Sequence, residues 1–151
     1  MSELISAEAR SWIGRSASPR RIEVSRGDIV RYAVATEQTA AKYLAGDEAP
    51  PMFLFGALRP VVPIAELAAD GLAADEFVPE LPLKRTMAGG IKLTYQRPIR
   101  PGDILLATRS LTDITEKQGK SGPFILITYL TRVETETGEL VAEEEQSRIV
   151  R

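Results

Sequence analysis

Apolar residues recur with a helical period in the first half of the chain and with a period of two in the second half. After a short alternating strand over residues 21–24, Ser25 stands at the position of a helix N-cap, with Asp28 at the capping-box position. The helix that follows is predicted to extend to about Thr36, with one apolar face. Residues 37–49 show no such period and are expected to form a loop.

An apolar segment over residues 52–58 has no polar side, which predicts a helix buried all round. Pro50 and Pro51 before it favour an extended approach followed by a helix start. A second helical piece is expected over residues 64–69, beyond a proline-containing interruption. The next segment, residues 72–86, is expected to be an ordered loop across the surface.

Beyond residue 90, alternating apolar and polar positions predict four antiparallel strands joined by glycine-containing turns. We expect the strands to cover residues 91–96, 104–111, 124–133 and 140–150, in the order of a meander. Helices followed by an antiparallel sheet indicate the α+β class. A length of 151 residues suits a single domain, residues 1–151.

The composition is that of an ordinary globular protein, with 44% hydrophobic and 26% charged residues. The net charge of −2 favours neither a nucleic acid nor an anionic membrane as a partner. No apolar run approaches the ~18 residues of a membrane span. The acidic N-terminal segment lacks the basic and apolar regions of a signal peptide. We therefore expect a cytoplasmic protein.

The chain contains no cysteine and no histidine. It therefore cannot form a Ser-His or Cys-His catalytic pair, and it lacks the usual zinc ligands, so no metal site is expected. Any acid or base that it uses must be Asp, Glu, Lys or Tyr.

The segment ahead of the apolar helix resembles the motif Gly-Asp-x-Asn-Pro-x-His of MaoC-like hot-dog hydratases. Gly46, Asp47 and Pro50 match the motif, whereas Ala49 stands in place of Asn and Met52 in place of the catalytic His. Residues 87–103 are similar to the second-strand block of the N-terminal dehydratase subtype, which is fatty-acid-synthase-like, and residues 112–117 with 138–143 resemble the rest of its sheet. The resemblance spans about residues 13–151. It implies a hot-dog fold, an antiparallel β-sheet wrapped around a buried central helix.

The resemblance implies (R)-specific hydration of a 2-enoyl thioester, or dehydration of a 3-hydroxyacyl thioester, in fatty acid metabolism. That chemistry needs a base to activate water, an acid to protonate carbon, and N–H donors for the enolate-like oxygen. Asp47 remains as a candidate catalytic group, but Met52 carries no proton. We therefore expect the non-catalytic half of a heterodimer, in which a second MaoC-like chain supplies the Asp and His. The resemblance implies a thioester of coenzyme A or of an acyl carrier protein as the substrate, and no cofactor is expected.

Candidate substrate-binding residues lie in three places: beside the motif (Ala49, Pro50, Met52, Phe53), in a glycine pair (Gly89, Gly90), and in a basic run (Lys84, Arg85, Lys92). The basic run extends through Arg97 and Arg100, contains no acidic residue and could receive phosphates.

Each candidate also has a purely structural interpretation. Asp47 could be a turn residue, Met52 and Phe53 could be core, the glycines could form a bulge, and the basic run could be a solvated strand face. The acidic stretch over residues 134–145 is expected to face solvent or a basic patch on a partner.

Two other functions remain open. A homodimer could act as a thioesterase or hydratase through Asp47 or Glu66, or the chain could be a non-enzymatic module that binds acyl thioesters.

Overall fold

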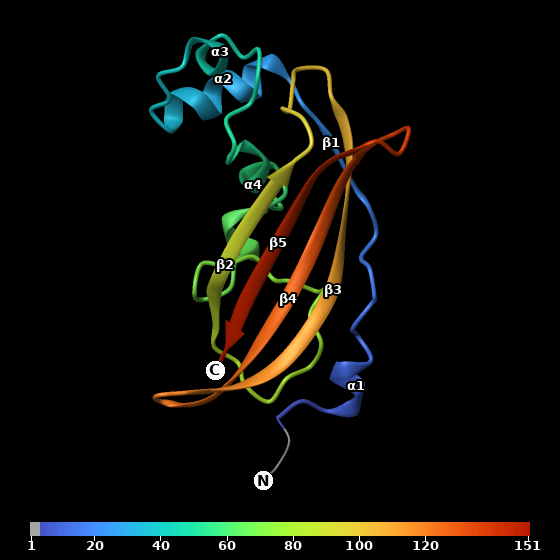
Figure 1. The fold of residues 1–151 in the computed structure, drawn as a ribbon. Coiled ribbons are helices and arrows are strands. Elements are labelled where there is room, and N and C mark those ends of the chain that lie inside the picture. The colour runs from blue at the N-terminus through green and yellow to red at the C-terminus, as the bar shows by residue number, and fades with distance from the viewer. Residues whose placement is uncertain (1–3) are drawn as a thin grey trace.

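The computed structural model describes residues 4–151. Its elements follow the order α1 (Ala7–Arg10), β1 (Arg20–Glu23), α2 (Arg26–Ala35), α3 (Ala41–Leu44), α4 (Phe53–Ala57), a 3-10 turn (Ile64–Glu66), β2 (Thr86–Tyr95), β3 (Ile104–Gly119), β4 (Gly122–Thr135) and β5 (Leu140–Val150). Long strands form one sheet, and α4 and the irregular chain after it lie against one face of that sheet (Figure 1). This arrangement is the predicted α+β architecture. The prediction that the N-terminal segment is not a signal peptide involves residues 1–3, which lie outside the described residues.

The sheet has the strand order β1-β3-β4-β5-β2, and every neighbouring pair is antiparallel. The predicted meander of four strands is therefore wrong for β2, which pairs with β5 and not with β3. The outer edge of β3 is already occupied by β1, with Arg20 opposite Ala107. Alternation of side chains identifies a strand and its buried face, but it carries no information on which strand lies alongside.

The start of α2 is as the sequence predicts. The Ser25 hydroxyl accepts a hydrogen bond from the Asp28 backbone N–H (3.0 Å) and donates one to the Asp28 carboxylate (2.6 Å). Val24 and Ile29 are both buried beside this cap. The short helix α3, in contrast, lies inside the segment that was expected to be a loop. Its N-cap residue, Ala40, makes no side-chain capping bond, so no capping signal marks it in the sequence.

The helix α4 is shorter than predicted, with five residues, and it is buried on one side only. Phe53 and Leu54 are buried, whereas Met52 is 45% exposed. The second helical piece is also wrong in extent, because only one exposed 3-10 turn forms, over Ile64–Glu66. Pro60 explains why α4 ends where it does, since proline has no N–H to donate and cannot continue a helix. The 3-10 turn ends at Leu67, whose backbone is extended, and no proline accounts for that.

The hydrophobic core has two parts, one toward each end of the sheet. One part packs α2 and α4 against Leu105, Val133 and Val141, among others. The other packs α1 and the segment around Phe77 and Leu81 against the opposite end of β3 and β4. Between these two parts, the same face of the sheet carries polar side chains. No helix in the described residues is long and apolar enough to cross a membrane.

Candidate functional site

The motif segment that precedes α4 is held against α2. Gly46 has a φ of +72°, and a Cβ built on it would lie 2.7 Å from the Arg26 side chain, so the position requires glycine. The next residue, Asp47, accepts from the Arg26 guanidinium at 2.5 Å and remains mostly exposed. This ion pair supports the interpretation of Asp47 as a residue that stabilises the turn. A catalytic role for Asp47 stays a prediction.

Tyr95 fixes the end of the motif segment. Its hydroxyl donates to the carbonyl of Pro51, and the Ala49 N–H donates to the carbonyl of Ile99 (2.8 Å). Burial, with a smaller contribution from the charge of Glu144, raises the pKa of Tyr95 to about 12. The phenol therefore stays protonated and able to donate at any physiological pH. A cavity of about 320 Å³ adjoins this segment and is bordered by both Ala49 and Tyr95.

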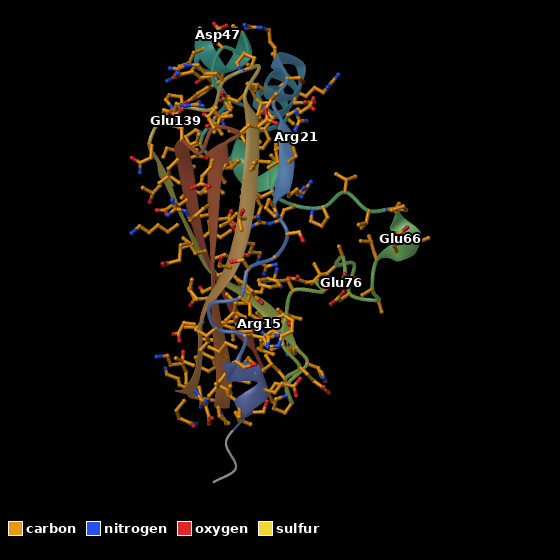
Figure 2. All side chains as sticks on the ribbon, turned by 90° about the vertical axis from the view of Figure 1, so that its right-hand side faces the viewer. Arg15, Arg21, Asp47, Glu66, Glu76 and Glu139 are labelled. Carbon is orange, nitrogen blue, oxygen red and sulfur yellow. The ribbon has the colours of Figure 1, made fainter. Side chains whose placement is uncertain are left out.

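The residues at the start of α4 divide between core and surface. The Phe53 ring packs edge-on against Tyr32, with ring centroids 5.6 Å apart, which agrees with the core interpretation. Met52 stands at the exposed N-cap of the helix. The candidate carboxylates Asp47 and Glu66 are not brought together, because Glu66 lies on a loop that projects from the body of the protein (Figure 2).

The glycine pair forms a bulge, as one of the two interpretations predicts. The register of β2 against β5 shifts between Ala88 and Gly90. A Cβ built on Gly89 would lie 2.6 Å from Ser147 Oγ and 2.9 Å from its carbonyl oxygen. Gly89 thus permits the close approach of another backbone. Contact of either glycine with a substrate stays a prediction.

The basic run does not form one patch. Lys84 and Arg85 precede the ten-residue strand β2 and Arg97 and Arg100 follow it, so roughly 30 Å of strand separates the two groups. Arg97 is engaged by the Asp103 carboxylate, with distances of 2.9 and 3.1 Å. The binding of phosphates by Lys84, Arg85 and Lys92 stays a prediction.

A larger cavity, of about 580 Å³, lies between the middle of the sheet and two stretches of the chain after α4, residues 58–60 and 72–75. It occupies the polar region between the two parts of the core. Its charged lining consists of Arg20, Arg59, Asp75, Arg109, Glu144 and Arg148. None of these six residues was singled out by the sequence motifs.

One carboxylate in this cavity joins two arginines. Oδ2 of Asp75 lies 2.9 Å from Nη1 of Arg109 and 2.5 Å from Nη1 of Arg148. The Arg109 guanidinium stacks on the Tyr129 ring, 3.7 Å from its centroid, and the Tyr129 hydroxyl donates to the Phe77 carbonyl (3.1 Å). Burial alone would raise the pKa of Asp75, but the two arginines and the Phe77 N–H outweigh it and lower that pKa below its usual value.

A second ion pair crosses the cavity from the chain after α4 to the sheet. Arg59 Nη1 lies 3.2 Å from Oε1 of Glu144, and the Arg59 guanidinium also lies 4.1 Å from the centroid of the Phe55 ring. Glu144 is only 2% exposed, whereas the Arg59 side chain is 32% exposed. The prediction that the acidic stretch 134–145 faces solvent is thus wrong for Glu144. Strand alternation turns this residue inward while its neighbours in sequence point outward.

Strand register places these polar groups in rows across one face. Arg109 is paired with Thr131, and Thr131 with Glu144, so the three lie side by side on adjacent strands. On β5, Gln146 and Arg148 share the parity of Glu144 and therefore its face. Val150 is buried, so every second residue before it on β5 also faces inward. Counting back in this way from the sequence would have found three polar residues on the inward face, Arg148, Gln146 and Glu144. Among residues 4–151, no group of three or more acidic side chains is placed to hold a metal ion.

The sequence matches the model of a family described as FAS1-like, dehydratase domain region, over residues 11–144. The chain belongs to this family. Its fold is that of solved MaoC-like and hot-dog proteins, as the motif segment and the strand blocks predict.

The mesaconyl-C(4)-CoA hydratase of Chloroflexus aurantiacus is 26% identical to this member of the FAS1-like dehydratase-region family over 147 residues. The alignment covers 97% of the chain and 52% of the relative, so the chain spans about half the length of the relative that it matches.

Solved structures with a similar fold include a chain of the ChsH1–ChsH2 complex from Mycobacterium tuberculosis. That chain matches with a TM-score of 0.65 and 17% identity, over 89% of this chain and 87% of its own length. The MaoC-like dehydratase from Rhodospirillum rubrum is similar with a TM-score of 0.59 and 20% identity, over 91% of each chain.

Proposed function

We propose that this chain is the non-catalytic, substrate-binding half of a two-part (R)-specific 2-enoyl-thioester hydratase or 3-hydroxyacyl-thioester dehydratase. The observation that carries the proposal is Met52 at the position of the family's catalytic His, in a chain without histidine. A thioether can neither accept nor donate the proton that this reaction moves. A second MaoC-like unit would supply the Asp and His.

The shortness of α4 supports a role in holding the substrate. Where a longer central helix would fill the space against the sheet, two stretches of irregular chain, residues 58–60 and 72–75, instead border a cavity of about 580 Å³. Cavities of roughly 300–1,000 Å³ are typical of small-molecule sites. The acyl group would enter this cavity while its thioester reaches the partner's Asp and His.

An open sheet edge supports assembly with a second hot-dog unit. β2 ends the sheet and spans ten residues, whereas β1 at the other edge spans four. Met87 and Ile91 on β2 are exposed large hydrophobic side chains. A long edge with unpaired backbone groups favours pairing with another chain. A relative in fold, ChsH1–ChsH2, is a complex of two named chains.

The test is hydration of crotonyl-CoA by the purified chain, alone and mixed with a MaoC-like partner that carries the full Asp and His motif. We expect no turnover by the chain alone, and turnover by the mixture above that of the partner alone. Turnover by the lone chain that Asp47→Asn abolishes, and that the exposed control Asp113→Asn leaves intact, would overturn the proposal.

The same assay separates the remaining functions. Thioester cleavage that is lost in Glu66→Gln would favour a homodimeric thioesterase, and tight binding without turnover in any mixture would favour a binding module. We expect Met52→His to create little activity, because Ala49 also departs from the motif. Strong hydratase activity in that variant would show that the rest of a catalytic site is present.

A further inference from the structure

The larger cavity is positively charged inside an acidic protein. Four arginines and two carboxylates line it, a net formal charge of +2, whereas the whole chain carries −2. All four cations are arginine, whose planar guanidinium matches the geometry of a carboxylate. A purely aliphatic acyl chain would displace water from these charges and return no polar contact, which is costly. An anionic group would contact the positive lining favourably.

Two of the arginines already hold a carboxylate. The Arg109 and Arg148 guanidiniums converge on Asp75, with Arg109 Nη1 within 3.1 Å of both carboxylate oxygens. Arg109 and Arg148 belong to the sheet, on β3 and β5, whereas Asp75 belongs to the irregular chain that covers it. The sheet thus presents a pair of guanidiniums spaced to bind one carboxylate between them.

Arg20 is the cavity arginine that remains available. It makes no hydrogen bond or ion pair through its side chain within residues 4–151, and it is exposed. Arg20 lies opposite Ala107, so it shares a sheet face with Arg109, two residues further along β3. Such diagonal neighbours have side chains roughly 7–8 Å apart at their bases, within reach of long arginine side chains.

We propose that this cavity binds the distal carboxylate of a dicarboxylic acyl thioester. Arg20 forms the direct ion pair, and Arg109 and Arg148 supply the second positive contact in competition with Asp75. The inference rests on the proposed function, in that an acyl thioester occupies the cavity, and it names the class of acyl group. The arginines of this cavity are separate from the motif segment, residues 46–52. One part of the protein would thus select the acyl group, and another part would lie beside the proton transfer.

The experiment compares two saturated, unreactive ligands with the same five-carbon acyl length, glutaryl-CoA and pentanoyl-CoA. Titration calorimetry on the purified chain, with its partner where the two co-purify, measures both dissociation constants. We expect glutaryl-CoA to bind at least tenfold more tightly. Arg20→Met should remove most of that preference without weakening pentanoyl-CoA. Asp75→Asn should increase the preference several-fold, because it removes the competing carboxylate.

Arg31→Met is the matched control, since Arg31 is an exposed arginine on α2 that does not line the cavity. It should leave both constants unchanged. The same two acyl groups carried on N-acetylcysteamine lack the phosphates of coenzyme A, and the preference should persist with them. Loss of the preference in these thioesters would show that it depends on the coenzyme A part and not on the acyl carboxylate alone, and would overturn the inference.

Equal or tighter binding of pentanoyl-CoA would overturn the inference and leave the proposed function standing, because a thioester still binds. A preference for glutaryl-CoA that Arg20→Met does not reduce would overturn the role of the cavity. If neither ligand binds in any preparation, the proposed function and the inference both fail.

Discussion

Replacing Arg59 with methionine tests the buried charge in the sheet directly. The change leaves the Glu144 carboxylate, 2% exposed, without its partner at 3.2 Å. Removal of one member of a buried ion pair typically costs about 3–5 kcal/mol.

We therefore expect Arg59→Met to lower the free energy of unfolding by about 2–4 kcal/mol at pH 7, somewhat below the full range because Arg59 itself is partly exposed. Urea denaturation followed by far-UV circular dichroism measures this value. With a typical urea dependence of about 1–3 kcal/mol per molar, the midpoint at pH 7 should fall by about 1–2 M. Methionine keeps most of the apolar stem, so lost packing against Phe55 contributes little.

The two partners differ in exposure, and this difference gives the control. Arg59 is 32% exposed and can stay hydrated without its partner, so Glu144→Gln should cost less than Arg59→Met. Arg132→Met breaks a pair with Glu143 in which both side chains are substantially exposed, and it should cost at most about 1 kcal/mol. A cost of Arg59→Met below that of Glu144→Gln, or no greater than that of Arg132→Met, would refute the reasoning.

Two further predictions concern β2. Gly89→Ala should destabilise the protein by about 2 kcal/mol, because the new Cβ would lie 2.9 Å from the Ser147 carbonyl oxygen. Gly90→Ala should cost less than half as much, because its Cβ would have no contact closer than 3.7 Å. Equal effects of the two variants in thermal denaturation would contradict this geometry. Tyr95 has a folded-state pKa of about 12, raised above the unfolded value, so its contribution is complete below about pH 10 and is lost as the pH rises toward 12. The free energy of unfolding, measured by urea denaturation, should therefore fall between pH 8 and pH 11.5 by about 1–2 kcal/mol less in Tyr95→Phe than in the parent protein, after allowance for partial exposure of Tyr95. The variant also loses the hydrogen bond to the Pro51 carbonyl, which lowers its stability equally at every pH. An equal fall in stability with pH in the variant and the parent would contradict the prediction.

The elements that the sequence predicted correctly depend on local interactions. The cap of α2 at Ser25 involves atoms three residues apart, and β5 follows the alternation over residues 140–150 with its predicted bounds. The departures concern α3, which no cap marks, and α4, which proline shortens. For the candidate site, the sequence located the motif segment and the missing histidine at Met52, and the structure added what holds that segment, the contacts of Gly46 and Tyr95.

The sequence by itself determined the α+β class, the family and the absence of an imidazole, because each depends on residue identity or on short periods along the chain. Only the tertiary structure decided that β2 lies beside β5, and that Arg59, Asp75, Arg109 and Glu144 meet in one cavity. These residues come from segments far apart in sequence, and their meeting depends on strand register and on a chain that proline keeps from forming a helix. A one-residue change of register would turn Glu144 to the other face of the sheet, so an acidic run in the sequence does not reveal which carboxylate is buried.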